Sequence, residues 1–179
     1  PSPGACPTRR PGRPSGTRRA REPAGLACGD TVNPLFVAKP SASSIATALK
    51  LWPELSGKRI RPLLISAFGD IYVEASTGEV LVADPLELCC EQVASSVREL
   101  EALFADTEWA QEQLLTELVL LAQERGKFRP EAQVFAIAPH PIWSGTIRVE
   151  SLVPMDLEVW HDICAQIRAQ TRSSPTAGC

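Results

Sequence analysis

The alternation of hydrophobic and polar residues is clearest in the middle of the chain. Residues 70–75 and 79–84 are short segments rich in aliphatic side chains, and residues 76–78, which include a glycine, separate them. Glycine readily adopts the positive φ that a tight turn requires. The pattern predicts an antiparallel β-hairpin, and residues 61–68, an apolar run of strand length, lead into it.

Residues with the properties of helices flank this hairpin on both sides. Residues 44–51 predict a short helix that ends before a proline, because a residue that precedes proline is disfavoured in the α conformation. Ser96 and Glu99 fit a capping box, in which the hydroxyl accepts from the third helical amide and the carboxylate returns to the first. A second cap at Asp106 introduces the longest predicted helix, residues 108–125.

Two strands and a helix are predicted in the last third of the chain. Residues 133–138 are strand-like, and residues 145–150 alternate so that Ile147 and Val149 share one face. Pro154 and Asp156 then introduce a final helix. Its predicted inward residues are Val159, Trp160, Ile163 and Ile167. The order of strands, helices, strands and helix predicts an α+β fold: a mostly antiparallel sheet with a hairpin, packed against two or three helices.

Charge and composition divide the chain into a tail and a domain. Residues 1–40 contain seven Lys/Arg and two Asp/Glu (net +5), whereas residues 41–179 contain eleven and nineteen (net −8), which together give −3. The first forty residues also hold eight of the sixteen prolines. We therefore expect residues 1–41 to be a disordered basic tail, residues 42–172 to form the domain, and residues 173–179 to fray.

The sequence argues against three other kinds of segment: a nucleic-acid-binding arm, a transit peptide and a membrane helix. A basic arm that binds nucleic acid would normally carry more lysines and some aromatic residues for stacking. An organellar transit peptide needs an amphipathic helix, which the prolines of the tail would break. No run in the chain approaches the roughly 18 apolar residues of a membrane helix. We expect neither a nucleic-acid partner nor a membrane.

The histidines and cysteines are the candidates for catalytic or metal chemistry. His140 and His161 are the only histidines, and Cys164 follows His161 at a spacing that places both on one helical face. A small thiol- or metal-assisted hydrolase that uses these three residues is therefore an alternative function. The paired Cys-x-x-Cys spacing of zinc sites and the complete P-loop motif are both absent. We expect no metal, no cofactor and no enzymatic activity.

Several segments together resemble one protein family. The resemblance covers roughly residues 60–168 and rests on the order and spacing of six segments: residues 68–71, 114–119 with Gly126, 133–137, Gly145, 154–157 and 165–167. In these segments the chain resembles the C-terminal domain of type VI secretion system immunity proteins, which is related to the GAD-like domain. The resemblance implies a bacterial protein that binds and neutralises a cognate effector toxin, a DNase, by occluding its active site.

The acidic charge of the domain agrees with that implied partner. A domain with net charge −8 repels nucleic acid but attracts a basic protein, and a DNase must present a positive groove to DNA. The residues that we predict to bind the toxin are five carboxylates around the hairpin and its exit and one tryptophan: Glu74, Glu79, Asp84, Glu87, Glu91 and Trp143. A scaffold domain without a toxin partner is a further alternative. Because the cysteines do not form a disulfide framework, we expect reduced thiols and a cytoplasmic location.

Overall fold

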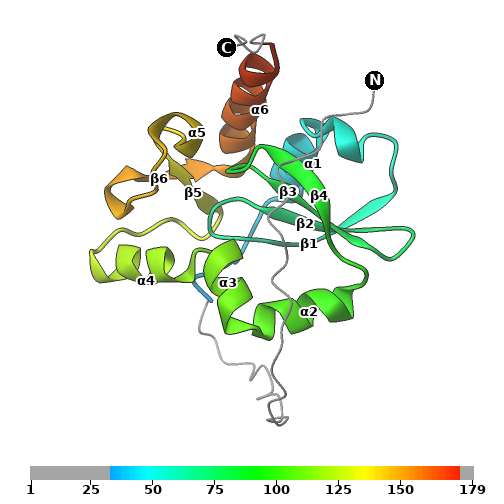
Figure 1. Cartoon of the computed structure of the whole chain (residues 1–179), viewed down its shortest axis with the longest axis horizontal. Coiled ribbons are helices and arrows are strands. Elements are labelled where there is room, and N and C mark those ends of the chain that lie inside the picture. The colour runs from blue at the N-terminus through cyan, green and yellow to red at the C-terminus, as the bar shows by residue number, and fades with distance from the viewer. Residues whose placement is uncertain (1–32, 174–179) are drawn as a thin grey trace, which may run out of the picture. The chain divides into compact units, whose positions relative to one another are not determined.

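The structure is a computed structural model, and it describes residues 33–173 (Figure 1). Most of the predicted tail and the chain from residue 174 onward lie outside the described residues. Residues 33–41, which the sequence analysis assigned to the tail, are part of the folded domain. Val37 is buried and its N–H donates to the carbonyl of Ile65 at 2.9 Å, while Ala67 N–H donates to the carbonyl of Leu35 at 2.7 Å. The domain therefore begins near Asn33 rather than at residue 42.

Four antiparallel strands form the main sheet, and each strand pairs with its neighbour in sequence. The strands are β1 (Ile60–Ile65), β2 (Ile71–Ala75), β3 (Val80–Asp84) and β4 (Cys89–Ala94). The predicted hairpin is confirmed as β2 and β3, which pair from Ile71 with Ala83 to Glu74 with Val80. Gly78 in the connecting turn has a φ of 99°, the conformation for which glycine was expected there.

Helices cover both faces of this sheet. Ile71, Val73 and Leu81 point to one face and pack against side chains of three helical segments: α1 (Ala42–Lys50), η1 (Pro53–Leu55) and α6 (Leu157–Ser173). Tyr72 and Val82, at alternate positions, point to the other face. There they pack against α2 (Val97–Ala105) and α3 (Thr107–Gln113). The α+β class predicted from the sequence is confirmed, because all four strands are antiparallel and helices pack against the sheet that they form.

A second sheet of two antiparallel strands consists of β5 (Gln133–Ile137) and β6 (Leu152–Asp156). Side chains of α4 (Thr116–Glu124) pack against it in a separate core cluster. A hydrogen bond from Phe135 N–H to the carbonyl of Ala67, 2.7 Å long, joins β5 to the segment that follows β1. Figure 1 shows α4, β5 and β6 together beside the main sheet.

The predicted helix from residue 108 to residue 125 is wrong, because the chain forms two helices there. Asp106 caps α3 as expected, its carboxylate accepting from the Glu108 and Trp109 amides. The helix then stops, since Leu115 adopts a left-handed conformation with a φ of 48°. This break buries Leu114 against the main sheet, so tertiary packing overrides a continuous helical pattern. The longest described helix is instead α6, with 17 residues.

The predicted capping box is confirmed only at its serine. The Ser96 hydroxyl accepts from the Glu99 amide at 3.2 Å and begins α2 as expected. The Glu99 carboxylate instead accepts from the amide of Ser95 at 2.8 Å, a residue that precedes the cap, and not from an amide at the start of the helix. The Ser96 side chain thus satisfies one amide of the first turn of α2, whereas the carboxylate binds the residue before the cap.

The predicted strand at residues 145–150 is also wrong. Between β5 and β6 the chain forms a one-turn helix, α5 (Pro141–Ser144), and a 3-10 turn, η2 (Val149–Ser151). The strand lies later, at β6, and includes Pro154 and Asp156, which were expected to introduce the last helix. In α6 Trp160 and Ile167 face inward as predicted and Ile163 is half-buried, but Val159 is exposed. Among residues 33–173 no helix has the length and apolar character to span a membrane.

Candidate partner-binding surface

The structure divides the predicted partner-binding residues among four places. Glu74 and Glu79 lie at the turn between β2 and β3, Asp84 and Glu87 lie at or beyond the other end of β3, and Glu91 lies on β4 opposite Val82, midway between these ends. At roughly 3.3 Å per residue, β3 separates these two ends by about 13 Å. The sixth residue, Trp143, lies on α5. The hairpin therefore does not gather its carboxylates into one patch.

The two carboxylates at the β2–β3 end interact with their own neighbours. Arg61 on β1 donates to the Glu74 carboxylate through Nε at 2.9 Å and through a guanidinium NH2 at 2.6 Å. The Thr77 hydroxyl donates to Glu79, and this hydrogen bond lowers the pKa of Glu79 below its usual value. Glu74 is thus already paired with a cation, and Glu79 is fixed within the turn.

Asp84 has a structural role in the turn between β3 and β4. Its Oδ1 accepts from the amides of Leu86 at 2.8 Å and Glu87 at 2.9 Å, which closes the turn. Burial raises the pKa of Asp84 to about 6. Continuing the register of β2 and β3 by one residue places Asp70 opposite, and burial together with the charge of Asp84 raises the pKa of Asp70 well above its usual value. Asp84 is therefore directed at the protein itself rather than at a partner.

Glu87 lies in the β3–β4 turn and Trp143 lies on α5, and the buried His140 connects these two segments by a hydrogen bond. His140 directly precedes α5, and its Nε2–H donates to the carbonyl of Pro85 in the β3–β4 turn at 3.0 Å. Glu87 is exposed two residues further along that turn, and its charge acts on His140, although burial has the larger effect and lowers the pKa of His140. Trp143 is 61% exposed.

Most of the negative charge of the domain lies elsewhere, on α2, α3 and α4. Residues 97–124 contain seven carboxylates and one arginine (net −6), whereas the rest of residues 33–173 contain twelve carboxylates and eleven Lys/Arg (net −1). The seven exposed carboxylates, which we call the acidic face, are Glu99, Glu101, Asp106, Glu108, Glu112, Glu117 and Glu124. None of them forms an ion pair within the described part of the chain. The sequence analysis did not include these carboxylates among the predicted partner-binding residues, because carboxylates at such positions usually only solvate a helix.

His161 uses both ring nitrogens inside the protein. The indole N–H of Trp52 donates to Nδ1 at 2.9 Å, so Nε2 carries the proton and donates to the carbonyl of Gly69 at 2.8 Å. Burial lowers the pKa of His161 to about 4, which keeps the ring neutral near pH 7. This histidine links α6 to the turns on either side of β1 and has no nitrogen left for a metal or a proton transfer.

The cysteines of the domain do not have the properties of reactive thiols. Cys164 is buried beside His161 on α6, and burial raises its pKa. Burial likewise raises the pKa of Cys90 to about 12. Catalytic cysteines require a lowered pKa and access to substrate. Within residues 33–173, His, Cys, Asp and Glu side chains form no group of three that could hold a metal ion. The geometry therefore does not favour the hydrolase alternative.

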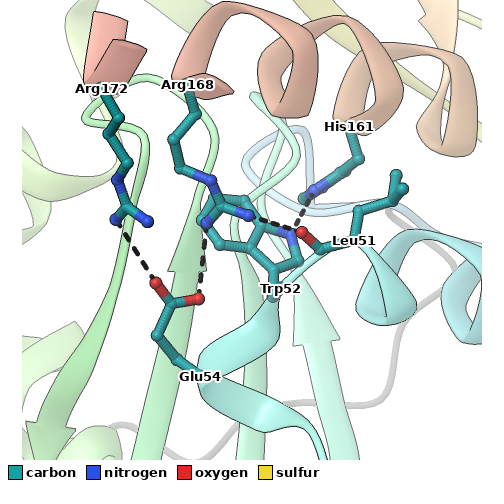
Figure 2. Close-up of polar contacts among 6 residues, drawn as sticks. All are labelled: Leu51, Trp52, Glu54, His161, Arg168 and Arg172. Atoms are coloured by element: carbon teal, nitrogen blue, oxygen red, sulfur yellow. Dashed lines mark hydrogen bonds and ion pairs between the residues drawn. The ribbon is translucent and has the colours of Figure 1, made fainter. Parts of the chain in front are cut away.

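Arg168 fixes the last turns of α6 against the segment that contains Trp52 (Figure 2). Its guanidinium lies 4.5 Å from the centroid of the Trp52 ring and donates to the carbonyl of Leu51 at 2.5 Å. Glu54 lies 3.4 Å from Arg168 and 3.6 Å from Arg172. Figure 2 shows the Trp52 ring between Arg168 and His161, so both residues of α6 hold the same indole. This cluster holds α6 against the segment that contains Trp52.

Comparison with known proteins leaves the family of the chain open. No protein-family model matches the chain, and no curated protein matches it significantly. The resemblance to type VI immunity proteins therefore rests on the residues themselves.

Proposed function

We propose that this chain is an immunity-type binding protein that neutralises a basic nuclease toxin of the type VI secretion class. The observation that carries the proposal is the acidic face, seven exposed carboxylates on three consecutive helices with one arginine among them. A nuclease binds DNA through a positive groove, because each phosphate contact needs a neutralising cation. A concentration of exposed carboxylates on these helices attracts such a groove and repels nucleic acid itself.

An inhibitor of this kind acts by binding alone and does not need to catalyse a reaction. The acidic face steers the encounter, and the bound domain then covers the groove of the toxin so that DNA is excluded. The internal hydrogen bonds of His161 and the burial of Cys164 support a binding role, because the groups that a hydrolase would use serve the fold. In this reading the protein acts in the bacterial cytoplasm, where it meets the toxin before or after delivery.

The test is co-expression with the nuclease effector encoded beside the gene of this chain. We expect cells that make the full chain to survive the toxin and the two proteins to co-purify. Survival without a complex, or killing despite production of the chain, would contradict the proposal. A genome in which no toxin gene adjoins this gene would contradict it as well.

A charge-matched pair of variants tests whether the acidic face carries the recognition. Glu112→Gln, Glu117→Gln and Glu124→Gln together remove three charges from the face. The control, Glu131→Gln, Glu150→Gln and Asp162→Asn, removes three exposed charges elsewhere. We expect the first variant alone to lower the association rate constant by about tenfold at low salt, with a weaker salt dependence. Equal effects of both variants would show that net charge, and not this face, determines binding.

A further inference from the structure

Two aspartates, Asp70 and Asp84, lie opposite each other at the ends of β2 and β3. Ile71 pairs with Ala83, so the register, continued by one residue, places Asp70 opposite Asp84. Directly opposed residues in an antiparallel pair have their Cβ atoms about 4.5–5.5 Å apart. Asp70 is 5% exposed and Asp84 is half-buried. We call these two residues the aspartate pair.

The aspartate pair has no ion-pair partner among residues 33–173. Two carboxylates at this separation repel each other when both are ionised, and the repulsion is strong where little water surrounds them. A single negative charge shared with one proton avoids this repulsion. The pair therefore keeps one proton at pH values at which an exposed aspartate has already lost its own.

The hydrogen bonds of Ser66 decide which oxygen of Asp70 can carry that proton. The Ser66 Oγ accepts from the amides of Phe68 at 3.2 Å and Asp70 at 3.1 Å, which uses both of its lone pairs. Its own hydrogen is therefore donated to Oδ2 of Asp70. Because Oδ2 acts as an acceptor, a proton on Asp70 lies on Oδ1.

Asp84 is the member of the pair that favours the ionised form. Its Oδ1 accepts from the amides of Leu86 and Glu87, and such hydrogen bonds stabilise a carboxylate. Burial raises the pKa of Asp84 to about 6, whereas burial and the charge of Asp84 raise the pKa of Asp70 well above its usual value. At pH 7 the pair thus carries one charge, on Asp84, and one proton, on Asp70.

The other titratable groups around the pair leave this balance unchanged. Glu87 and Glu91 are negatively charged, and each raises the pKa of Asp84 further. Burial raises the pKa of Tyr72 on β2 and of Cys164 on α6, so both groups are neutral near pH 7. Since these neighbours are negative or neutral, none of them replaces the proton as the source of positive charge.

We propose that the aspartate pair makes closure of the β3–β4 turn depend on pH: the pair holds one proton while the turn is closed and releases it when the turn opens. Opening moves both carboxyl groups into water, where both ionise at neutral pH. The carbonyl of Pro85 in this turn accepts from His140, so opening also detaches α5. A regulated contact between α5 and the main sheet follows from one buried proton.

The direction of the effect follows from the two raised pKa values. Both lie above the ordinary aspartate value of 3.8. The contribution of the pair to closure is therefore fully present below pH 3.8 and is lost as pH rises through the folded pKa values. Alkaline conditions thus favour the open turn.

Amide hydrogen exchange of the full chain tests the proposal. The reporters are the Leu86 and Glu87 amides, which donate to Asp84 and exchange when the turn opens. Release of one proton raises the equilibrium constant for opening up to about tenfold per pH unit. After correction for the intrinsic exchange rate, we expect their protection factors to fall by at least about tenfold between about pH 6 and pH 8. A smaller change would overturn the proposal.

Asp70→Asn and its matched control, Glu91→Gln, separate the pair from the general charge of the region. Asparagine keeps an acceptor for Ser66 and a donor toward Asp84 but never ionises, so protection of the two amides should stay within about twofold over the same pH range. Glu91→Gln removes one charge near Asp84 and should retain the full pH dependence. Loss of the pH dependence in both variants, or in neither, would overturn the proposal.

Carbon-13 NMR of the full chain, labelled at the aspartate side-chain carboxyl, detects the proton without relying on a variant. We expect one aspartate carboxyl resonance to have the chemical shift of a protonated group at pH 7 and to disappear in Asp70→Asn. If every aspartate carboxyl of the wild-type chain is ionised at pH 7, the pair holds no proton and the proposal fails. Both measurements use the chain alone, so their outcomes are independent of the proposed function.

Discussion

Trp52 and His161 are 109 residues apart in the sequence and are joined by a buried hydrogen bond of 2.9 Å. The same indole lies against Arg168, so one side chain from the start of the domain connects two positions of its last helix (Figure 2). His161 continues the connection to Gly69 at the entry to the hairpin. Chain segments from both ends of the domain thus meet at one neutral histidine.

Trp52→Phe tests the contribution of this hydrogen bond to stability. The substitution leaves Nδ1 of His161 buried without a donor, which costs about 1–3 kcal/mol. We expect the free energy of unfolding in urea to fall by that amount. Trp143→Phe, an exposed control, should change it by less than about 0.5 kcal/mol. An equal effect of both substitutions would show that the buried bond contributes nothing specific.

Gly69→Ala and Gly78→Ala separate steric clash from backbone strain. Both glycines have positive φ, 95° and 99°. A Cβ at Gly69 would lie 3.0 Å from Cδ1 of Trp160, whereas a Cβ at Gly78 would meet nothing within 4 Å. We expect Gly78→Ala to cost about 1 kcal/mol from strain alone, and Gly69→Ala to cost about 1–3 kcal/mol more. Chemical denaturation measures both, and equal losses would show that Trp160 moves aside freely.

Arg168→Lys tests whether the planar guanidinium is required against Trp52. Lysine keeps the charge but loses the stacked arrangement and one of the donors that Arg168 directs at Leu51 and Glu54. We expect a loss of about 1–3 kcal/mol in the free energy of unfolding. Arg172→Lys, at an exposed ion pair with the same Glu54, should change it by less than about 0.5 kcal/mol. A larger effect at Arg172 would contradict this assignment.

Asp84 should make stability depend on pH. Its folded pKa, about 6, lies above the ordinary value of 3.8, so its contribution is fully present below pH 3.8 and is lost as pH rises through 6. Asp84→Asn keeps an acceptor for the turn amides and never ionises. We expect the variant to exceed wild type in stability by about 1–3 kcal/mol at pH 7.5, and this gain to vanish near pH 4.

Urea unfolding at both pH values measures this difference. His161 makes stability depend on pH in the opposite direction. Its folded pKa, about 4, lies below the ordinary value of 6.5, so its contribution to stability is lost as pH falls through 4. That loss is common to wild type and variant and cancels in the comparison. Glu87→Gln, in the same turn, is the control and should show no such gain. A constant penalty for Asp84→Asn at every pH would contradict the expectation.

Thiol labelling followed by mass spectrometry tests the chemistry of Cys164. Because burial raises its pKa and removes access, we expect alkylation of the native protein at pH 8 to be limited by unfolding of the domain. Urea should therefore accelerate labelling in parallel with unfolding. Rapid modification of Cys164 in the native state would instead revive the thiol hydrolase alternative.

The sequence was sufficient wherever local chemistry decides the conformation. The alternation around Gly78 specified the hairpin, Asp106 specified the start of α3, and Ser96 specified the start of α2. These features depend on neighbours within a few residues, so a pattern contains them.

Only the tertiary structure decided the features that depend on distant contacts. Burial of Leu114 on the main sheet breaks a helix that local propensity would continue, and pairing with β5 places the sixth strand later than the alternation predicted. Asp84, counted as a surface carboxylate, closes a turn instead. The sequence by itself determined the α+β class and the negative charge. Tertiary packing determined which carboxylates remain exposed. It also determined that His140 joins α5 to the β3–β4 turn, because hydrogen bonds between segments more than 50 residues apart leave no periodic signal.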